Sequence, residues 1–296
     1  MAASVRVAVC TNRPAAAVAG SLAALREQVP EGDLALVTSG LAGPELEAHR
    51  RAFDGPVVVE PRPGLSRARN AALAWAGDDE AVIAFVDDDA VVEAGWHSAL
   101  TRRWDEAPPE VACIGGPIRP RFAGSPPPWY SDGIAHVLTL LDRGGAVRDL
   151  DPEQEAVYGA NISFRAGPLR RAGGFDPDLG HAGGRVWFGE EDEAQRALAR
   201  LGFGTRYVPD AAVWHVIPPN RLRRRAFLRR RFAYGRVLGA RAGRPRALAA
   251  RRALVTGLGA AAAAATGQQA LAMTRAVRAA ENVGVLTARS GGARPA

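Results

Sequence analysis

Three consecutive aspartates, Asp87, Asp88 and Asp89, directly follow a short apolar run of the sequence. Carboxylates this close raise one another's pKa unless a positive partner compensates them. Their oxygens are the ligands that Mg²⁺ and Mn²⁺ prefer, and both ions usually complete their coordination with substrate phosphate and water. The cluster therefore predicts a divalent-metal site for a phosphorylated ligand, with a solvated acidic turn as the alternative.

A second acidic cluster, Glu190, Glu191, Asp192 and Glu193, follows Gly189. A helix is expected to begin here, because apolar residues recur at helical spacing directly afterwards. A carboxylate that lies near a reacting hydroxyl group could remove its proton as a general base. The same charges would also complement the dipole at the start of a helix. Asp192 could then pair with Arg196 one turn later. The residues alone leave both interpretations open.

Two further places carry nitrogen-bearing side chains that could bind a ligand. Arg67, Arg69 and Asn70 lie on an expected helix just after Gly64, and His215 ends a short apolar segment. Arginine binds phosphate through a charge-assisted fork, although on a single helix it is equally compatible with surface charge. A single histidine more often packs or hydrogen-bonds than binds metal, but it could supply a nitrogen ligand to an oxygen-rich site.

The elements that position these residues follow an α/β pattern. Short runs rich in Val, Ile and Leu predict strands that are buried on both faces of a parallel sheet, at 5–10, 34–37, 57–59 and 81–86. The segments 15–28, 44–52 and 65–75 between them predict crossover helices. Ligands of such sheets collect beyond the carboxyl ends of the strands. Thr11, Asn12 and Arg13 follow the first run there, as the aspartates follow the fourth.

Beyond residue 111 the pattern loosens. The sequence predicts a strand over 160–164, a Gly-rich segment over 173–189 and two short strands at 205–208 and 212–216. We therefore expect a mostly parallel central sheet with flanking helices in a catalytic domain over 1–218. Residues 219–296 would form a helical extension.

Charge is unevenly distributed along the chain. The net charge is +7, yet residues 211–280 contain 15 arginines and no aspartate or glutamate, so the remainder is net acidic. A basic helical tail favours peripheral contact with an anionic membrane. The uncharged stretch 253–274 is mostly Ala, Gly, Gln and Thr, so we do not expect it to span a bilayer. Nucleic-acid binding would leave the acidic motifs unexplained and is not expected.

The cysteines and the N-terminus bear on the cellular location. Cys10 and Cys113 are the only cysteines, and the apolar run 5–10 follows Met1 without the pattern of a signal peptide. Two thiols in a chain of this kind are expected to be reduced. The sequence therefore predicts a cytoplasmic protein.

Taken in order, the motifs resemble those of the family 2 inverting glycosyltransferases over residues 5 to about 240. The matching segments are residues 11–13, 63–70, 85–89, 158–165, 173–176, 189–192 and 213–215. The resemblance implies a GT-A type fold of the nucleotide-diphospho-sugar transferases, with a donor half over about 1–110 and an acceptor half over about 111–218. It also implies the transfer of a sugar from a nucleotide-diphosphate donor to an acceptor hydroxyl group, with inversion of the anomeric centre.

The resemblance further implies roles for individual residues. Asp89 would ligate Mn²⁺ or Mg²⁺, His215 could join this metal site, and Asp192 would be the catalytic base. Asp87 would lie near the donor ribose, and Arg69 would approach the nucleotide. The donor-binding set is Thr11, Asn12, Arg13, Arg69, Asp87 and Asp88. We assign Asn161 and Trp187 to the acceptor, which the aromatic residues Trp129 and Tyr130 could also border.

Two departures from the family pattern limit the transfer of roles. The second strand ends at residues 37–40 without the aspartate that reads the nucleobase in family members, although a UDP-sugar is the predicted donor. The acidic pair is extended, so Glu191 could take the place of Asp192 as base. The acceptor would be a sugar, a lipid-linked group or a small molecule in the biosynthesis of a bacterial glycan or glycoconjugate. A sugar nucleotidyltransferase is the alternative enzyme.

Overall fold

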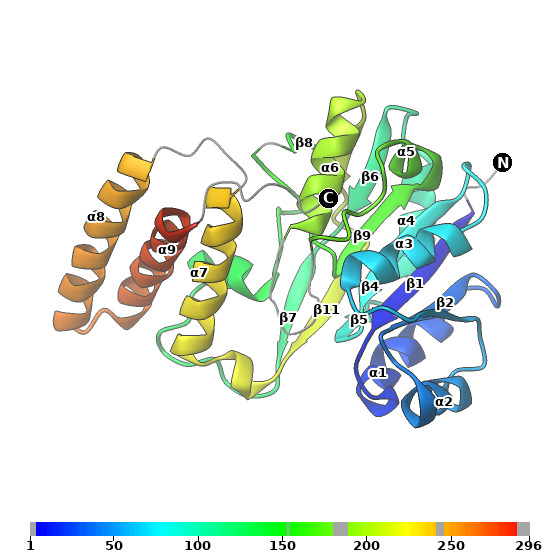
Figure 1. The fold of residues 1–296 in the computed structure, drawn as a ribbon, viewed down its shortest axis with the longest axis horizontal. Helices are drawn as coiled ribbons and strands as arrows, with labels where there is room; N and C mark the ends of the chain where they lie inside the picture. The colour runs from blue at the N-terminus through cyan, green and yellow to red at the C-terminus, as the bar shows by residue number, and fades with distance from the viewer. Residues whose placement is uncertain (1–3, 153, 180–188, 241–245, 289–296) are drawn as a thin grey trace. The chain divides into compact units, whose positions relative to one another are not determined.

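The computed structural model describes residues 4–152, 154–179, 189–240 and 246–288 (Figure 1). These residues form two compact units. Of the described residues, the first unit contains 4–121, 140–152, 154–179 and 189–216, and the second contains 122–139, 217–240 and 246–288.

The N-terminal part of the first unit alternates strands and helices, as the apolar runs predict. Strands β1 and β2 are parallel, and β1 also pairs in parallel with β4 while β2 pairs with β3. The residues of β1, β2 and β4 are buried along nearly the whole length, which explains why these runs are continuously apolar rather than alternating. The elements are β1 (Val5–Thr11), α1 (Ala15–Arg26), β2 (Leu34–Ser39), α2 (Gly43–Ala52), β3 (Val57–Glu60), α3 (Leu65–Trp75) and β4 (Val82–Asp87).

The remainder of the first unit completes the main sheet and adds a second one. The eight-stranded sheet has the order β3-β2-β1-β4-β9-β6-β10-β8, and β5, β11 and β7 form a three-stranded sheet. Strand β9 is antiparallel to both β4 and β6. The elements are β5 (Ala90–Val92), α4 (Trp96–Asp105), β6 (Val111–Gly115), β7 (Ile118–Phe122), β8 (Arg148–Leu150), β9 (Asn161–Arg165), α5 (Ala166–Arg171), α6 (Glu190–Arg200), β10 (Gly204–Tyr207) and β11 (Val213–Ile217).

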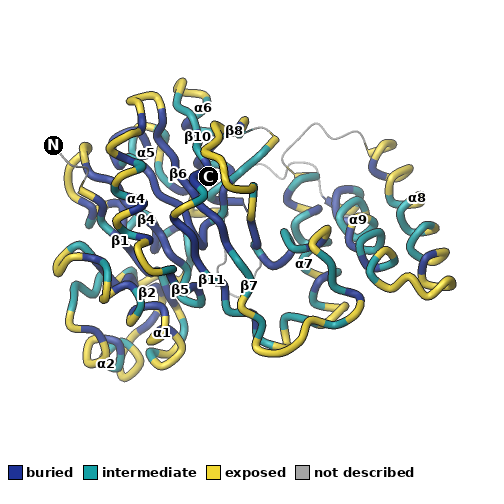
Figure 2. Tube along the Cα trace, turned by 180° about the vertical axis from the view of Figure 1, so that it is seen from behind, coloured by how far each residue is buried: buried dark blue, intermediate teal, exposed yellow. Residues whose placement is uncertain are grey.

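The core of the first unit lies along the central strands, which are buried in Figure 2. Three phenylalanines meet there, with the ring of Phe175 lying 5.5 Å from Phe85 and 5.7 Å from Phe164 in edge-to-face geometry. The Gly-rich segment is held at the same place, because the side chain of Asn70 bonds to both the N–H and the C=O of Phe175. The predicted α/β fold with a mostly parallel central sheet and flanking helices is confirmed.

The second unit is helical. It contains the short 3₁₀ helices η1 (Asp132–Leu138) and η2 (Pro219–Arg221), followed by α7 (Arg224–Ala240), α8 (Arg246–Ala265) and α9 (Gln269–Thr287). Helices α7 and α9 approach closely at Gly235, where a Cβ atom would lie 2.0 Å from the carbonyl oxygen of Glu281. Arg231 on α7 donates a 2.7 Å hydrogen bond to the carboxylate of the same Glu281 on α9. Among the helices that the structure describes, none is both long enough and apolar enough to cross a membrane.

Candidate active site

The aspartate cluster lies where β4 ends and the chain turns into β5. Asp88 is held by the loop after β1: Thr11 Oγ1 donates a 2.5 Å bond to one carboxylate oxygen, and Arg13 donates a 3.2 Å bond to the other. Ser21 on α1 donates to the backbone carbonyl of Asp88. The parallel pairing of β1 with β4 brings these residues together at the carboxyl ends of the two strands. Asp88 therefore anchors the turn, a contact that the sequence does not predict.

Asp89 lies beside His215, a residue 126 positions later that the sequence predicts as its partner. Strand β11 runs antiparallel to β5 and places His215 opposite Ala90. As a result His215 Nε2 lies 3.2 Å from Asp89 Oδ1, and the His215 side chain is 2% exposed. Arg13 lies 3.6 Å from the other oxygen of Asp89.

The pair Asp89 and His215 fits a divalent cation. Neighbouring ligands of an octahedral ion with bonds of about 2.1 Å lie about 3 Å apart, close to the observed 3.2 Å separation. Within the described residues, no group of three or more His, Cys, Asp and Glu side chains forms a complete metal-binding set. Two protein ligands suit an ion that completes its shell with substrate phosphate and water.

Arg69 on α3 joins the two predicted acidic clusters. Its guanidinium lies 2.9 Å from Glu190, 3.8 Å from Glu191 and 3.7 Å from Asp87. The carboxylates at the start of α6 therefore meet the aspartate that ends β4, although more than 100 residues separate them in the sequence. We call Arg69, Asp87, Glu190 and Glu191 the arginine hub.

The hub is buried, and the predicted contact between Arg69 and the nucleotide stays a prediction. The Arg69 side chain is 2% exposed, with its guanidinium 5.7 Å from the ring of Phe85 and 5.5 Å from that of Phe175. Gly159 lies against it so closely that a Cβ atom there would come within 2.0 Å of Arg69 Nη2. Arg69 thus binds carboxylates of its own chain, and its charge acts on the site through them.

Burial governs the acidity of the clusters. Removal from water raises the pKa of Asp87 to about 6, with Arg69 opposing this change and Asp89 adding to it. Burial also raises the pKa of Asp88, against the effect of its bond from Thr11. At the start of α6, burial and then the charge of Glu191 raise the pKa of Glu190 to about 8, despite Arg69. One buried guanidinium shared by three carboxylates does not compensate all of their charge.

Helix α6 carries the predicted base. Asp192 is 9% exposed in the first turn of the helix. The helix is fixed one turn later, because the side chain of Gln195 accepts a bond from the N–H of Val157 and donates one to its C=O. The backbone before β9, which includes Gly159, is thereby attached both to α6 and to the hub.

The residues predicted to bind the acceptor lie in different surroundings. Asn161 is 3% exposed and its side chain is satisfied within the protein, since it accepts a bond from Trp96 Nε1 and donates to the carbonyls of Pro117 and Ala211. Its assignment to acceptor binding stays a prediction. Trp187 lies outside the described residues. Trp129 is buried against Phe227 in the second unit, with ring centroids 5.0 Å apart.

Comparison with known proteins identifies the domain that contains the aspartate cluster. Residues 7–151 match the model of the family described as Glycosyl transferase family 2. This part of the chain, just under half of its length, is similar to family 2 glycosyltransferase domains. The chain is also 30% identical, over 118 residues, to a glucosyl-dolichyl phosphate glucuronosyltransferase of Haloferax volcanii. That match covers 40% of this chain and only 36% of the relative.

Solved structures support the glycosyltransferase fold. The mannosyltransferase PcManGT from Pyrobaculum calidifontis, in complex with GDP-Man and Mn²⁺, superposes with a TM-score of 0.63 at 20% identity. The superposition covers 97% of this chain and 88% of that one. GalNAc-T7 with UDP, GalNAc and Mn²⁺ gives a TM-score of 0.52 at 15% identity, over 73% of this chain and 44% of the other. At these identities the likeness concerns the fold.

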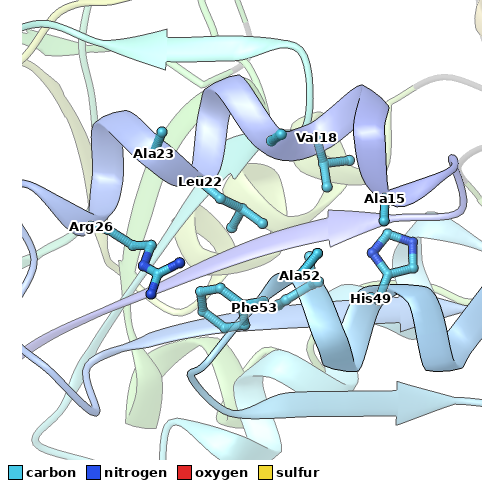
Figure 3. Close-up of a pocket in the computed structure, with 10 residues that line it drawn as sticks. Ala15, Val18, Leu22, Ala23, Arg26, His49, Ala52 and Phe53 are labelled. Carbon is cyan, nitrogen blue, oxygen red and sulfur yellow. The ribbon is translucent and has the colours of Figure 1, made fainter.

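A pocket of about 90 Å³ also lies in the glycosyltransferase domain, between α1 and α2 (Figure 3). Its walls are mainly apolar, and it contains none of the residues predicted for the donor, the acceptor or the metal. Sites for small molecules usually measure about 300–1,000 Å³. This pocket is therefore too small for a nucleotide sugar.

Proposed function

We propose that the chain transfers a sugar from a nucleotide-diphosphate donor to an acceptor hydroxyl group, with the help of a divalent metal and with inversion of the anomeric centre. The observation that carries the proposal is the meeting of the two acidic clusters. The aspartates beyond β4 and the carboxylates that begin α6 converge on Arg69, and Asp89 lies beside His215.

In the proposed reaction, Asp89 and His215 would hold Mn²⁺ or Mg²⁺. When bound, the cation would supply Lewis-acid stabilisation for the negative charge that builds up on the leaving diphosphate. Arg13 lies 3.6 Å from Asp89 and is the partly exposed arginine of this loop, so it could add a charge-assisted contact to a phosphate. Thr11 and Asp88 would keep this loop in place.

Asp192 would take the proton from the attacking acceptor hydroxyl, with Glu191 as the alternative base. A positioned general base contributes about 10²–10⁴-fold to the rate of such a step. The arginine hub would orient the first turn of α6, because Glu190 and Glu191 directly precede Asp192 and both pair with Arg69. Arg69 and Glu190 therefore have a positioning role in the proposal.

The finer parts of the proposal concern substrates and location. The named complexes contain GDP-Man in one neighbour and UDP in another, which supports a nucleotide-sugar donor. A UDP-sugar is the donor we propose. The name of the Haloferax volcanii relative describes a sugar carried on dolichyl phosphate, which supports a lipid-linked acceptor. We also propose a cytoplasmic location with peripheral contact to an anionic membrane, and a role in bacterial glycan or glycoconjugate biosynthesis.

The test is to incubate the purified chain with UDP- and GDP-sugars, Mn²⁺ or Mg²⁺ and candidate acceptors, and to measure the released nucleoside diphosphate with and without EDTA. We expect release that requires metal and that is lost in Asp89→Ala. Asp54→Ala is the matched control, because this side chain is 81% exposed on the surface. Release that persists in folded Asp89→Ala, or formation of pyrophosphate from a nucleoside triphosphate, would contradict the proposal.

A further inference from the structure

Helix α8 presents an unusually apolar face to solvent. Leu254, Val255 and Leu258 are between 61% and 65% exposed, and Leu248 is 41% exposed. Leu254 and Leu258 are four residues apart, so they lie on the same side of the helix, with Val255 beside them. The alanines that continue this side, Ala261, Ala262 and Ala265, are also exposed. Figure 2 shows exposed stretches along α8.

The opposite side of α8 is occupied by its own unit. Ala249 and Ala263 are buried at 4% and 3% exposure. Arg275 on α9 donates a 2.9 Å bond to the carbonyl of Gly259, which fixes the register of the two helices. The helix is therefore held by small residues on one side, and its large apolar side chains point away from the contact. We call the exposed side, with Leu248, Leu254, Val255 and Leu258, the α8 strip.

The charges around the strip identify a negatively charged partner. Arg251 and Arg252 are exposed one turn before Leu254 and Val255. Over residues 219–240 and 246–288 the chain has thirteen arginines, and Glu281 is the single carboxylate side chain among them. Arg231 binds that glutamate. A second copy of this unit would bring an equal excess of positive charge against the strip, and the two would repel each other.

We infer that the α8 strip docks on an anionic phospholipid bilayer. Leucine and valine side chains would enter the boundary between headgroups and acyl chains, while Arg251 and Arg252 reach the lipid phosphates from the same helix. This assigns the membrane contact of the proposed function to one helix of the basic tail, α8. The inference rests on that part of the proposal and makes it more specific. Membrane binding can be measured without turnover, so its test is independent of the catalytic activity.

The experiment is co-sedimentation of the full chain with vesicles of phosphatidylcholine alone and with vesicles of equal parts phosphatidylcholine and phosphatidylglycerol. We expect binding to the anionic vesicles that weakens with added salt. The double variant Leu254→Ser/Leu258→Ser should lower the partition coefficient at least about tenfold, because binding scales with the apolar area that is buried. Arg251→Gln/Arg252→Gln should lower it about 30-fold, from the usual contribution of each arginine near an anionic surface.

Leu201→Ser is the matched control, because Leu201 is a 49% exposed leucine at the end of α6 in the first unit, and it should leave binding unchanged. Circular dichroism of each variant would establish that the helices are intact. Equal binding by the wild type and the leucine double variant would overturn the inference. It would also be overturned if the wild type is a dimer without lipid and the leucine variant is a monomer, since the strip would then bind a second copy.

Discussion

Glu190 offers a test of the arginine hub that does not depend on substrate. Its side chain is 4% exposed, and it shares the guanidinium of Arg69 with Glu191 and Asp87. Burial raises its pKa from 4.5 to about 8. A carboxyl whose pKa is higher in the folded state than in the unfolded state takes up a proton on folding between these two pH values. The free energy of unfolding therefore falls as pH rises through this interval.

The magnitude follows from the two pKa values. Each pH unit inside the interval costs up to about 1.4 kcal/mol of stability, and the whole interval at most about 5 kcal/mol. Glu190→Gln removes the ionisable group and keeps an oxygen that can accept the hydrogen bond from Arg69. We expect the variant and the wild type to have similar stability near pH 4.5, and the variant to become progressively more stable than the wild type towards pH 8.

The assay is urea unfolding followed by tryptophan fluorescence, from about pH 5 to about pH 8.5, with the free energy taken by linear extrapolation. Glu193→Gln is the control, because Glu193 is in the same turn but pairs with Arg200 near the surface. If Glu190→Gln and Glu193→Gln show the same pH dependence as the wild type, the hub does not hold an uncompensated carboxyl.

Three further predictions concern single residues. Arg69→Met should lower the free energy of unfolding by about 3–5 kcal/mol because it leaves buried carboxylates unpaired, and Arg69→Lys should lower it less; urea unfolding measures both. Asn161→Ala should lower the free energy of unfolding by about 3 kcal/mol, measured by the same method, because the Trp96 N–H and two carbonyls lose their partner. An unchanged free energy of unfolding together with a raised acceptor KM would instead support acceptor binding by Asn161. Asp192→Asn should lower kcat by about 10²–10⁴-fold with little change in donor KM, and an equal loss in Glu191→Gln alone would move the base to Glu191.

The sequence predicts the first half of the fold well because each strand there can be recognised from a short local pattern. Each of β1, β2 and β4 is a continuous apolar run that ends in polar residues, and this pattern is typical of strands covered on both faces. In the second half, the sequence predicts short strands close to β9, β10 and β11 but not how they pair. Strand β9 inserts antiparallel between β4 and β6, and β10 joins β6 across nearly 90 residues. Pairings of this kind depend on contacts between distant segments, which a pattern along the chain does not contain.

For the site, the sequence predicts which residues gather but not which of them are buried. The ends of β1 and β4 meet as expected, and His215 reaches Asp89 through a strand that is recognisable as an apolar run. Arg69 and Asn161 carry the residue types of ligand-binding groups. Both side chains are buried and already have partners inside the chain. Arg69 pairs with three carboxylates, and the amide of Asn161 makes three hydrogen bonds.

The three aspartates acquire different roles because the strand and the turn direct them to different partners. Asp87 faces Arg69, Asp88 is bound by Thr11 and Arg13, and Asp89 lies against His215. Two arginines, Arg13 and Arg69, face the carboxylates of both clusters, so negative charge remains in excess. A buried excess of this kind must be offset by protons or by a cation. The raised pKa of Glu190 places one proton at the hub, away from Asp89, and leaves the Asp89–His215 pair as the position where a divalent cation can compensate the rest.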